Sequence, residues 1–421
     1  MLYTKNETYR RHRGYTRHRN YHRHYRRKPP YFKYLIIVLA ILLGLWLSKF
    51  LINSLLDSFN PFGSDQEISD TKYEDKKDES SDKDEDDEDT DGIYYYYESI
   101  NEADKELYDT ILKGINNFKD DITVNTNDID KINDIIEMIR RDHAEIFWFK
   151  AHGIYQIDGQ SNIVVDYSYD KKEVQKRQVK IESSTKDILN QMSETQGDYA
   201  KAKLAYEYII DTVKYDLKSK DNQNLYSSLV NKKSVCAGYA SGLQYLLQKS
   251  GIQSILVTGT ANGENHAWNI IKYKNQFYNI DVTFGDSMII KNNKEIEREK
   301  GTYDYSYFFV PDDILINDHA KSKDRVPYPK CSHKEYAYYI RKGTYSEDFD
   351  DNVINAFKQF LDSNEKEFSW QFSNKESYKK FKKSAEFGKI RALINFKGSS
   401  GQAYIYKFND NTYVVTIAID Q

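Results

Sequence analysis

The chain has 421 residues, with 61 Lys and Arg against 65 Asp and Glu. That length suits two or three domains. It contains only two cysteines, Cys236 and Cys331, which excludes a small secreted scaffold held by disulfides, because such scaffolds need more cysteines at close spacing. The formal net charge of −4 averages a strongly basic start and a strongly acidic stretch.

Residues 1–33 are almost purely basic, and we expect them to form a disordered cytoplasmic tail. Arg and His alternate with Tyr in this segment, a pattern that can bind single-stranded nucleic acid. An apolar segment follows directly, however, so attraction to anionic lipid is the favoured role. We therefore expect no specific nucleic-acid partner.

The apolar segment 34–56 is long enough for one transmembrane helix, since about 20 residues at a rise of about 1.5 Å cross a bilayer core of about 30 Å. A cleavable signal peptide is the alternative, but the basic region is long and no small-residue cleavage site follows. The positive-inside rule keeps the basic flank in the cytoplasm. We therefore predict a single-pass protein of the cell membrane with an extracellular folded part, which the acidic, disordered linker 57–92 holds off the membrane.

Residues 93–190 are predicted to form an N-terminal α+β region. Apolar residues at helical spacing predict helices over 101–118 and 126–141. Two segments rich in aromatic and β-branched residues, 145–149 and 162–169, are predicted to be strands.

A further helix is predicted over 200–215. Ser234 then has the side chain of a good N-cap for a helix over 235–250, which stops at Gly251. This prediction places Cys236 in the first turn of a helix.

A β-hairpin is predicted next, with its turn between Tyr273 and Gln276. This pairing brings Asp281 diagonally opposite His266, and because side chains alternate with period two, the two residues share a face. A slip of one residue would separate them, so the register decides the geometry. The two strands are expected at 267–272 and 276–282.

Residues 321–421 are predicted to form a C-terminal α+β region without a chemical motif of its own. We expect it to serve in packing or in positioning a ligand. Its predicted elements are a helix over 350–361, a strand over 389–396 and a hairpin of strands 402–408 and 412–419.

Cys236, His266 and Asp281 occur in the order and on the elements that suit a cysteine nucleophile, its base and the residue that orients the base. Unpaired backbone N–H groups and the helix dipole at a helix start stabilise a thiolate. An aspartate that accepts a proton from one ring nitrogen of His266 fixes its tautomer and leaves the other nitrogen for the sulfur. A Cys236–Cys331 disulfide is conceivable but would remove the nucleophile, so we expect free thiols.

These residues lie in three short motifs that resemble the core of the transglutaminase-like superfamily. The resemblance covers residues 200–286 and implies an α+β, papain- and transglutaminase-like core, in which a helix carrying the cysteine packs on an antiparallel sheet carrying the histidine and aspartate. It implies the roles of nucleophile, base and orienter for Cys236, His266 and Asp281, within a catalytic domain over 191–320. The motifs are Val235-Cys236-Ala237-Gly238-Tyr239-Ala240, His266-Ala267-Trp268-Asn269 and Asp281-Val282-Thr283.

Two positions depart from the family pattern. Ser234 stands where a glycine is frequent, and Val282-Thr283-Phe284 replaces the Pro-Thr-Trp of many relatives. The second change alters the wall beside the aspartate and leaves the three proposed catalytic residues intact.

An oxyanion hole needs two donors, and the backbone N–H of Cys236 is one candidate. Asn224, Tyr226 and Asn265 are open candidates for the second donor. Trp268 could either line a substrate channel or belong to the core.

The sequence thus predicts a thiol enzyme that acts on amide or peptide bonds through a thioester, as a transglutaminase, deamidase or protease. The alternative is an inactive transglutaminase-like surface module that binds a partner. We expect no cofactor and no metal. The expected partners are the membrane and a protein or peptide substrate, including substrates associated with a cell wall.

Overall fold

The computed structural model describes residues 92–157, 159–286, 289–291, 294–296, 303–323, 325–397 and 403–420. The predicted tail, the predicted transmembrane segment and nearly all of the acidic linker lie outside these residues. Within the described part of the chain, no helix combines the length and the apolar character that crossing a membrane requires.

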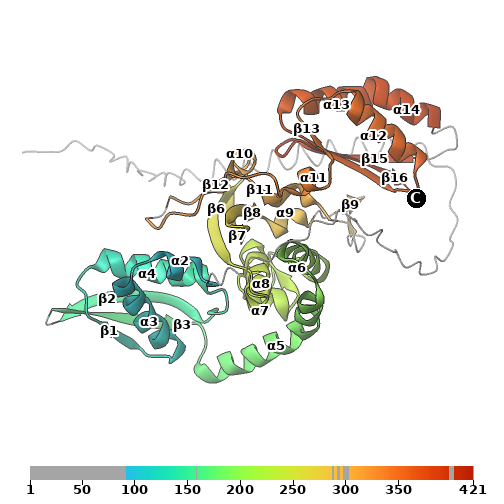
Figure 1. Cartoon of the computed structure of the whole chain (residues 1–421). Helices are drawn as coiled ribbons and strands as arrows, with labels where there is room; N and C mark the ends of the chain where they lie inside the picture. The colour runs from blue at the N-terminus through green and yellow to red at the C-terminus, as the bar shows by residue number, and fades with distance from the viewer. Residues whose placement is uncertain are drawn as a thin grey trace, which may run out of the picture. The chain divides into compact units, whose positions relative to one another are not determined.

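The first region is a three-stranded antiparallel sheet, in the order β1-β3-β2, with helices packed against it (Figure 1). Both predicted helices are present, and each begins at a side-chain cap: Asn101 accepts from the Asp104 N–H and Asp128 from the Lys131 N–H. The elements are α2 (Tyr95–Ser99), α3 (Glu102–Asn116), β1 (Asp121–Val124), α4 (Ile129–Asp142), β2 (Phe149–Ile157) and β3 (Gln160–Tyr167).

The strand predicted at 145–149 is wrong. The chain turns after α4, with the Ile146 N–H donating to the His143 carbonyl and the Phe149 N–H to the Ile146 carbonyl, and β2 begins only at Phe149. The apolar character of this segment serves the core and not a strand: Phe147 packs against two hydrophobic clusters.

The 24-residue helix α5 (Lys171–Glu194) follows and was not predicted. It buries Val174 in the core of the first region, whereas Ile181, Ile188 and Met192 belong to the next core. A largely polar helix with widely spaced apolar residues gives a weak periodic signal, which explains why the pattern was missed.

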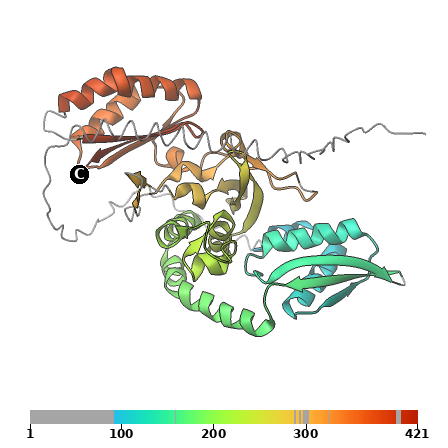
Figure 2. The same cartoon turned by 180° about the vertical axis from the view of Figure 1, so that it is seen from behind.

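The central region is a five-stranded antiparallel sheet in the order β11-β8-β7-β6-β12, with α8 packed against β6 and β7 (Figure 2). Its main elements are α6 (Asp198–Thr212), α7 (Leu225–Leu229), α8 (Cys236–Lys249), β6 (Ser254–Ala261), β7 (Glu264–Tyr273), β8 (Gln276–Ile280), β11 (Phe308–Val310) and β12 (His319–Lys321).

Helix α8 ends as predicted at Gly251, whose φ of +82° suits glycine. The Ile252 N–H donates to the Leu247 carbonyl and the Gly251 N–H to the Gln248 carbonyl, the two bonds of a Schellman motif. Short elements complete this part of the chain: β4 (Lys214–Tyr215), β5 (Lys233–Ser234), α9 (Val282–Gly285), β9 (Ile289–Lys291), β10 (Lys294–Ile296), the 3₁₀ helix η1 (Tyr305–Tyr307) and α10 (Asp312–Leu315).

The last region is a four-stranded sheet in the order β13-β14-β16-β15, with helices packed on β14 and β16 (Figure 1). The predicted helix and hairpin are present. The elements are α11 (Tyr338–Arg341), β13 (Tyr345–Ser346), α12 (Asp351–Asp362), β14 (Glu367–Phe372), α13 (Lys375–Phe387), α14 (Lys389–Lys397), β15 (Ala403–Asn409) and β16 (Val414–Asp420).

The strand predicted at 389–396 is wrong, because these residues form helix α14. Ile390 and Ile394, four residues apart, are buried, whereas Phe396 is 80% exposed. A spacing of four places the two isoleucines on one face of a helix, and the apparent alternation of the segment was coincidental.

Candidate active site

Cys236 is the first residue of α8, and Val235 occupies the N-cap position in an extended conformation. The prediction that Ser234 caps this helix is wrong. Its hydroxyl instead donates to the Asn222 carbonyl at 2.8 Å and lies 2.6 Å from the Ser227 hydroxyl. Because the first turn of a helix leaves its N–H groups without intrahelical acceptors, Cys236 still lies at the positive end of the helix dipole.

Gly238 lets the start of α8 approach the chain that precedes it. A Cβ atom at this position would lie 1.9 Å from Ser234 Oγ and 2.9 Å from the Asn224 carbonyl oxygen. The glycine is therefore required by the packing of α8 on α7 and β5, and this packing fixes the position of Cys236.

The β7–β8 hairpin has the predicted register, with Tyr273 opposite Gln276. Lys274 and Asn275 form its two-residue turn with φ values of +46° and +59°, as in the turns that match the twist of a hairpin. The second strand is shorter than predicted, because the chain leaves β8 after Ile280 and turns into α9. Asp281 is the residue at that junction.

Asp281 is completely buried, and its carboxylate accepts four hydrogen bonds. Oδ1 accepts from the backbone N–H groups of Thr283 at 2.9 Å and Phe284 at 3.1 Å, and so caps α9. Oδ2 lies 2.6 Å from His266 Nε2 and 3.0 Å from His319 Nε2. Burial alone would raise the pKa of Asp281, but the charges and hydrogen bonds of the two histidines hold it well below its usual range.

His266 lies on β7 with its side chain 6% exposed. Burial lowers its pKa, but the charge and hydrogen bond of Asp281 and the hydrogen bond with Cys236 outweigh burial and raise the pKa to about 10. Since Nε2 is taken by Asp281, the ring has Nδ1 left for the sulfur. The three predicted residues therefore lie close together, with Asp281 on one nitrogen of His266 and Cys236 near enough to His266 for each to shift the pKa of the other.

The Cys236 thiol is free and half-buried. Burial raises its pKa, but the hydrogen bond and charge of His266, with the backbone N–H groups of Ala267 and Ala237, outweigh burial and lower the pKa. The other thiol, Cys331, is also free and fully buried, and burial raises its pKa. A thiolate is thus favoured at Cys236 alone of the two.

His319 is a buried neighbour of this group that the sequence did not reveal. It lies on the three-residue strand β12, 38 positions after Asp281, and its Nδ1 is 2.5 Å from Asp318 Oδ1. The one available signal was the adjacent Asp-His pair, which has no motif around it.

Ligand atoms of His266, Asp281 and His319 all lie within 4.8 Å of one another, as they would around a metal ion. In a tetrahedral zinc site with bonds of about 2.0 Å, however, ligand atoms lie roughly 3.3 Å apart. The 2.6 Å separation between His266 and Asp281 is that of a charge-assisted hydrogen bond. Hydrogen bonding therefore accounts for the spacing of this cluster.

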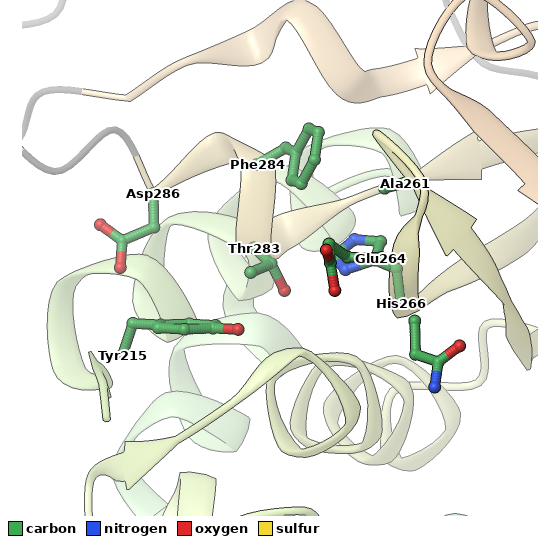
Figure 3. A pocket seen from close by; sticks show the side chains of 8 residues that line it. Tyr215, Ala261, Glu264, His266, Thr283, Phe284 and Asp286 are labelled. Carbon is green, nitrogen blue, oxygen red and sulfur yellow. The ribbon is translucent and has the colours of Figure 1, made fainter. Parts of the chain in front are cut away.

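A cavity of about 300 Å³ opens beside His266. Figure 3 shows Tyr215 and Asp286 on one side of it and His266 and Glu264 on the other, with Thr283 and Phe284 of α9 between them. Two carboxylates, Glu264 and Asp286, lie in the cavity wall together with apolar side chains and the imidazole of His266. The carboxylates suit a cationic substrate group.

Of the three candidates for the second oxyanion-hole donor, one lies at the cavity. Asn224 is used as the N-cap of α7, where it accepts from the Ser227 N–H and donates to Asp221, and Tyr226 is buried beneath Phe147 and Arg177. Asn265 is exposed and lines the cavity, so it alone of the three remains suitably placed.

Trp268 belongs to the core and does not line the cavity. It is fully buried, donates from Nε1 to Asn279 Oδ1, and its ring lies parallel to His266 with centroids 6.1 Å apart. It therefore supports the imidazole from one side.

Residues 186–282 match the family model described as the transglutaminase-like superfamily. Among solved structures, a TGase is 16% identical with a TM-score of 0.25, over 32% of this chain and 44% of that one. The periplasmic domain of TgpA from Pseudomonas aeruginosa is 15% identical with a TM-score of 0.22, over 30% and 54%. The chain thus spans about half the length of these two structures. No curated protein matches it.

Proposed function

We propose, from the premise that this chain contains a transglutaminase-like domain, that it is a thiol enzyme acting on carboxamide or peptide bonds. Cys236 is the nucleophile, and His266 is the general base and acid. Asp281 orients His266 and stabilises its protonated form. The observation that carries the proposal is the 2.6 Å hydrogen bond between His266 and the buried Asp281, beside a thiol at the first residue of α8 whose pKa His266 lowers.

The proposed reaction has two halves. The Cys236 thiolate attacks the carbonyl carbon, the C–N bond breaks, and the imidazolium of His266 gives its proton to the leaving ammonia or amine. The resulting thioester is then attacked by an amine or by water, which returns a proton to His266 as the thiolate leaves. An incoming amine yields an isopeptide bond, and water yields deamidation or proteolysis.

Negative charge develops on the substrate oxygen in both halves. The backbone N–H of Cys236 is suited to stabilise it, because the first N–H of a helix has no intrahelical acceptor. Asn265 is proposed as the second donor, from its place in the cavity wall beside His266.

We propose the transfer reaction over plain hydrolysis, with the two carboxylates of the cavity wall as the support. Glu264 and Asp286 would attract a lysine side chain or another primary amine toward the thioester. We therefore propose an amine as the second substrate, with a protein or peptide carboxamide as the first.

The experiment that tests the proposal measures three products with the full chain in detergent. These are incorporation of a fluorescent primary amine into a glutamine-containing protein, release of ammonia, and peptide cleavage. Cys236→Ala is expected to abolish whichever reaction the wild-type chain catalyses, because the nucleophile is lost. Cys331→Ala is the matched control, since it removes the other thiol, and it should retain activity.

Loss of activity in both cysteine variants would point to unfolding, and equal activity in both would disprove the thiol mechanism. In the latter case the alternative, a transglutaminase-like surface module that binds a partner without chemistry, would be the better description.

We further propose that the enzyme works at the outer face of a cell membrane, on surface or wall-associated substrates. The support is the sequence alone: a basic segment, the apolar segment 34–56 and an acidic stretch in that order. Deleting 34–56 should release the protein from the membrane fraction, and protease added to intact cells should digest the part after residue 57. Protection from that protease would reverse the proposed orientation.

A further inference from the structure

His319 lies on β12, the edge strand of the central sheet, and its side chain reaches Asp281. Strand β12 pairs with β6, where His319 faces Ala261, and the other side of β6 pairs with β7, where His266 faces Gly259. Because paired residues and residues two apart share a face, His266 and His319 lie on the same face of the sheet. The ring centroids of His266 and His319 are 5.4 Å apart.

Both nitrogens of His319 meet a buried carboxylate oxygen. Nε2 is 3.0 Å from Asp281 Oδ2, and Nδ1 is 2.5 Å from Asp318 Oδ1. The side chains of His319 and Asp281 are fully buried and that of Asp318 is 1% exposed. A neutral imidazole has one donor and one acceptor, so only the doubly protonated ring can donate to both carboxylates.

We propose that His319 is a positioning residue of the thiol site: as an imidazolium fixed between Asp281 and Asp318, it holds the Asp281 carboxylate ionised and directed at His266. This inference rests on the proposed function and deepens it. The proposed catalytic series then continues beyond Asp281 through His319 to Asp318.

Among the described residues that face His319, the one other cation is His266 of β7. The remaining groups are the carboxylates of Asp281 and Asp318, the Tyr307 hydroxyl group bonded to Asp318, and the rings of Trp268 and Phe284. Burial lowers the pKa of His319, but its hydrogen bonds to the two aspartates outweigh burial and raise it. Charges therefore alternate from the thiolate to Asp318.

Without the imidazolium, two buried carboxylates would face each other. One of them would then take up a proton more readily, because like charges in a water-excluded site cannot both stay ionised easily. A protonated Asp281 no longer stabilises the imidazolium of His266, and the removal of a nearby positive charge also disfavours the thiolate. Both effects raise the pH at which Cys236 becomes reactive.

The test is the pH dependence of iodoacetamide alkylation at Cys236, measured by peptide mapping on the full chain with EDTA present. His319→Gln keeps a donor toward Asp281 but cannot carry charge, and we expect its reactivity midpoint to rise by about one pH unit. At a pH well below both midpoints, alkylation should fall about tenfold. His143→Gln is the matched control, because it alters another buried histidine beside a carboxylate, Glu145, and should leave the midpoint unchanged.

A second variant covers the case in which His319→Gln fails to fold. In the pair Asp318→Asn with His319→Gln, the new amide at 318 can donate to the glutamine oxygen, which restores the hydrogen bonds without charge. We expect this variant to melt near the wild-type temperature and to show a smaller rise of the midpoint than His319→Gln, because the cation beside Asp281 is lost together with the more distant carboxylate that would have repelled it. In the wild type, ¹⁵N NMR should find both ring nitrogens of His319 protonated at pH 7.

The outcomes distinguish the two proposals. A wild-type midpoint near about 8.5, the value of an ordinary thiol, would overturn the proposed function and this inference with it. A low wild-type midpoint that persists in both His319 variants, or a neutral His319 at pH 7, would overturn this inference alone.

Discussion

At the scale of single residues, Asp281 determines most of the local structure. One carboxylate oxygen ends β8 and starts α9 by accepting two backbone N–H groups, while the other receives His266 and His319. Carboxylates that accept several hydrogen bonds in a buried position stay ionised far below their ordinary pKa. The charge of Asp281 should therefore contribute to stability as well as to chemistry.

Asp281→Asn tests this contribution, because asparagine can keep the cap of α9 but not the charge. We expect the variant to lose about 3 kcal/mol of unfolding free energy at pH 7, since one partner of a buried ion pair is removed. The pKa of Asp281 is lowered in the folded chain, so its stabilising effect is complete above the ordinary value of about 4 and is lost as the pH falls below it. Urea unfolding from pH 7 to pH 3 should show the difference between wild type and variant shrinking only below about pH 4; a constant difference would contradict the assignment.

The sequence predicted three of the residues in this cluster and missed the fourth. Cys236, His266 and Asp281 could be found because a helix start and a hairpin register constrain where their side chains lie. His319 could not, because its strand has three residues and pairs with β6, a strand that the sequence analysis did not identify. Their catalytic roles stay predictions until activity is measured.

At the scale of elements, the site depends on two tight turns and one close helix contact. Asn262 and Gly263 join β6 to β7, and Lys274 and Asn275 join β7 to β8, all with positive φ. Asn-Gly is the strongest short hairpin signal in a sequence, so β6 was in principle predictable from it. Helices α5 and α14 were harder, because α5 is largely polar and its few apolar residues lie up to seven positions apart, and the sequence of α14 also fits the alternation of a strand.

Gly238→Ala tests the close contact at the start of α8. The added Cβ would lie 1.9 Å from Ser234 Oγ and 2.9 Å from a backbone oxygen, so we expect a loss of about 1–3 kcal/mol of unfolding free energy. Displacement of the first turn should also slow alkylation of Cys236. Gly153→Ala is the control, because its Cβ would meet no atom within 4 Å, and its effect should stay within about 0.5 kcal/mol. Equal effects of the two substitutions would refute the packing argument.

At the scale of the whole molecule, the described residues form several core clusters, three of which contain a tryptophan. Trp148 lies in the first region, Trp268 in the central sheet and Trp370 in the last sheet. Phe147 and Met138 each pack against two clusters and so join the first region to the central one. The cluster around Trp370 shares no residue with the others. The α+β class was predictable from the sequence, but this division of the cores was not.

Three variants, each with one of these tryptophans and phenylalanine at the other tryptophan positions, should therefore report separate transitions. In guanidinium, we expect the fluorescence of Trp148 and Trp268 to change together, and that of Trp370 to change at a different concentration, because chains with separate cores need not unfold in one step. Tyrosine fluorescence and circular dichroism of each variant would control for damage from the substitutions. Three coincident curves would show one cooperative unit instead.

The double use of Asp281 has a consequence for mutational screens. A mutational scan can score cellular abundance and activity separately. At a position such as Cys236, whose thiol is expected to matter only for chemistry, substitutions should lower the activity score and leave the abundance score unchanged. At position 281 the scores should fall together for almost every amino acid, since the same carboxylate starts a helix and holds two imidazoles. Selection for activity at this position would then also be selection for folding, and drift toward an inactive binding protein would have to begin at Cys236 and not at the aspartate.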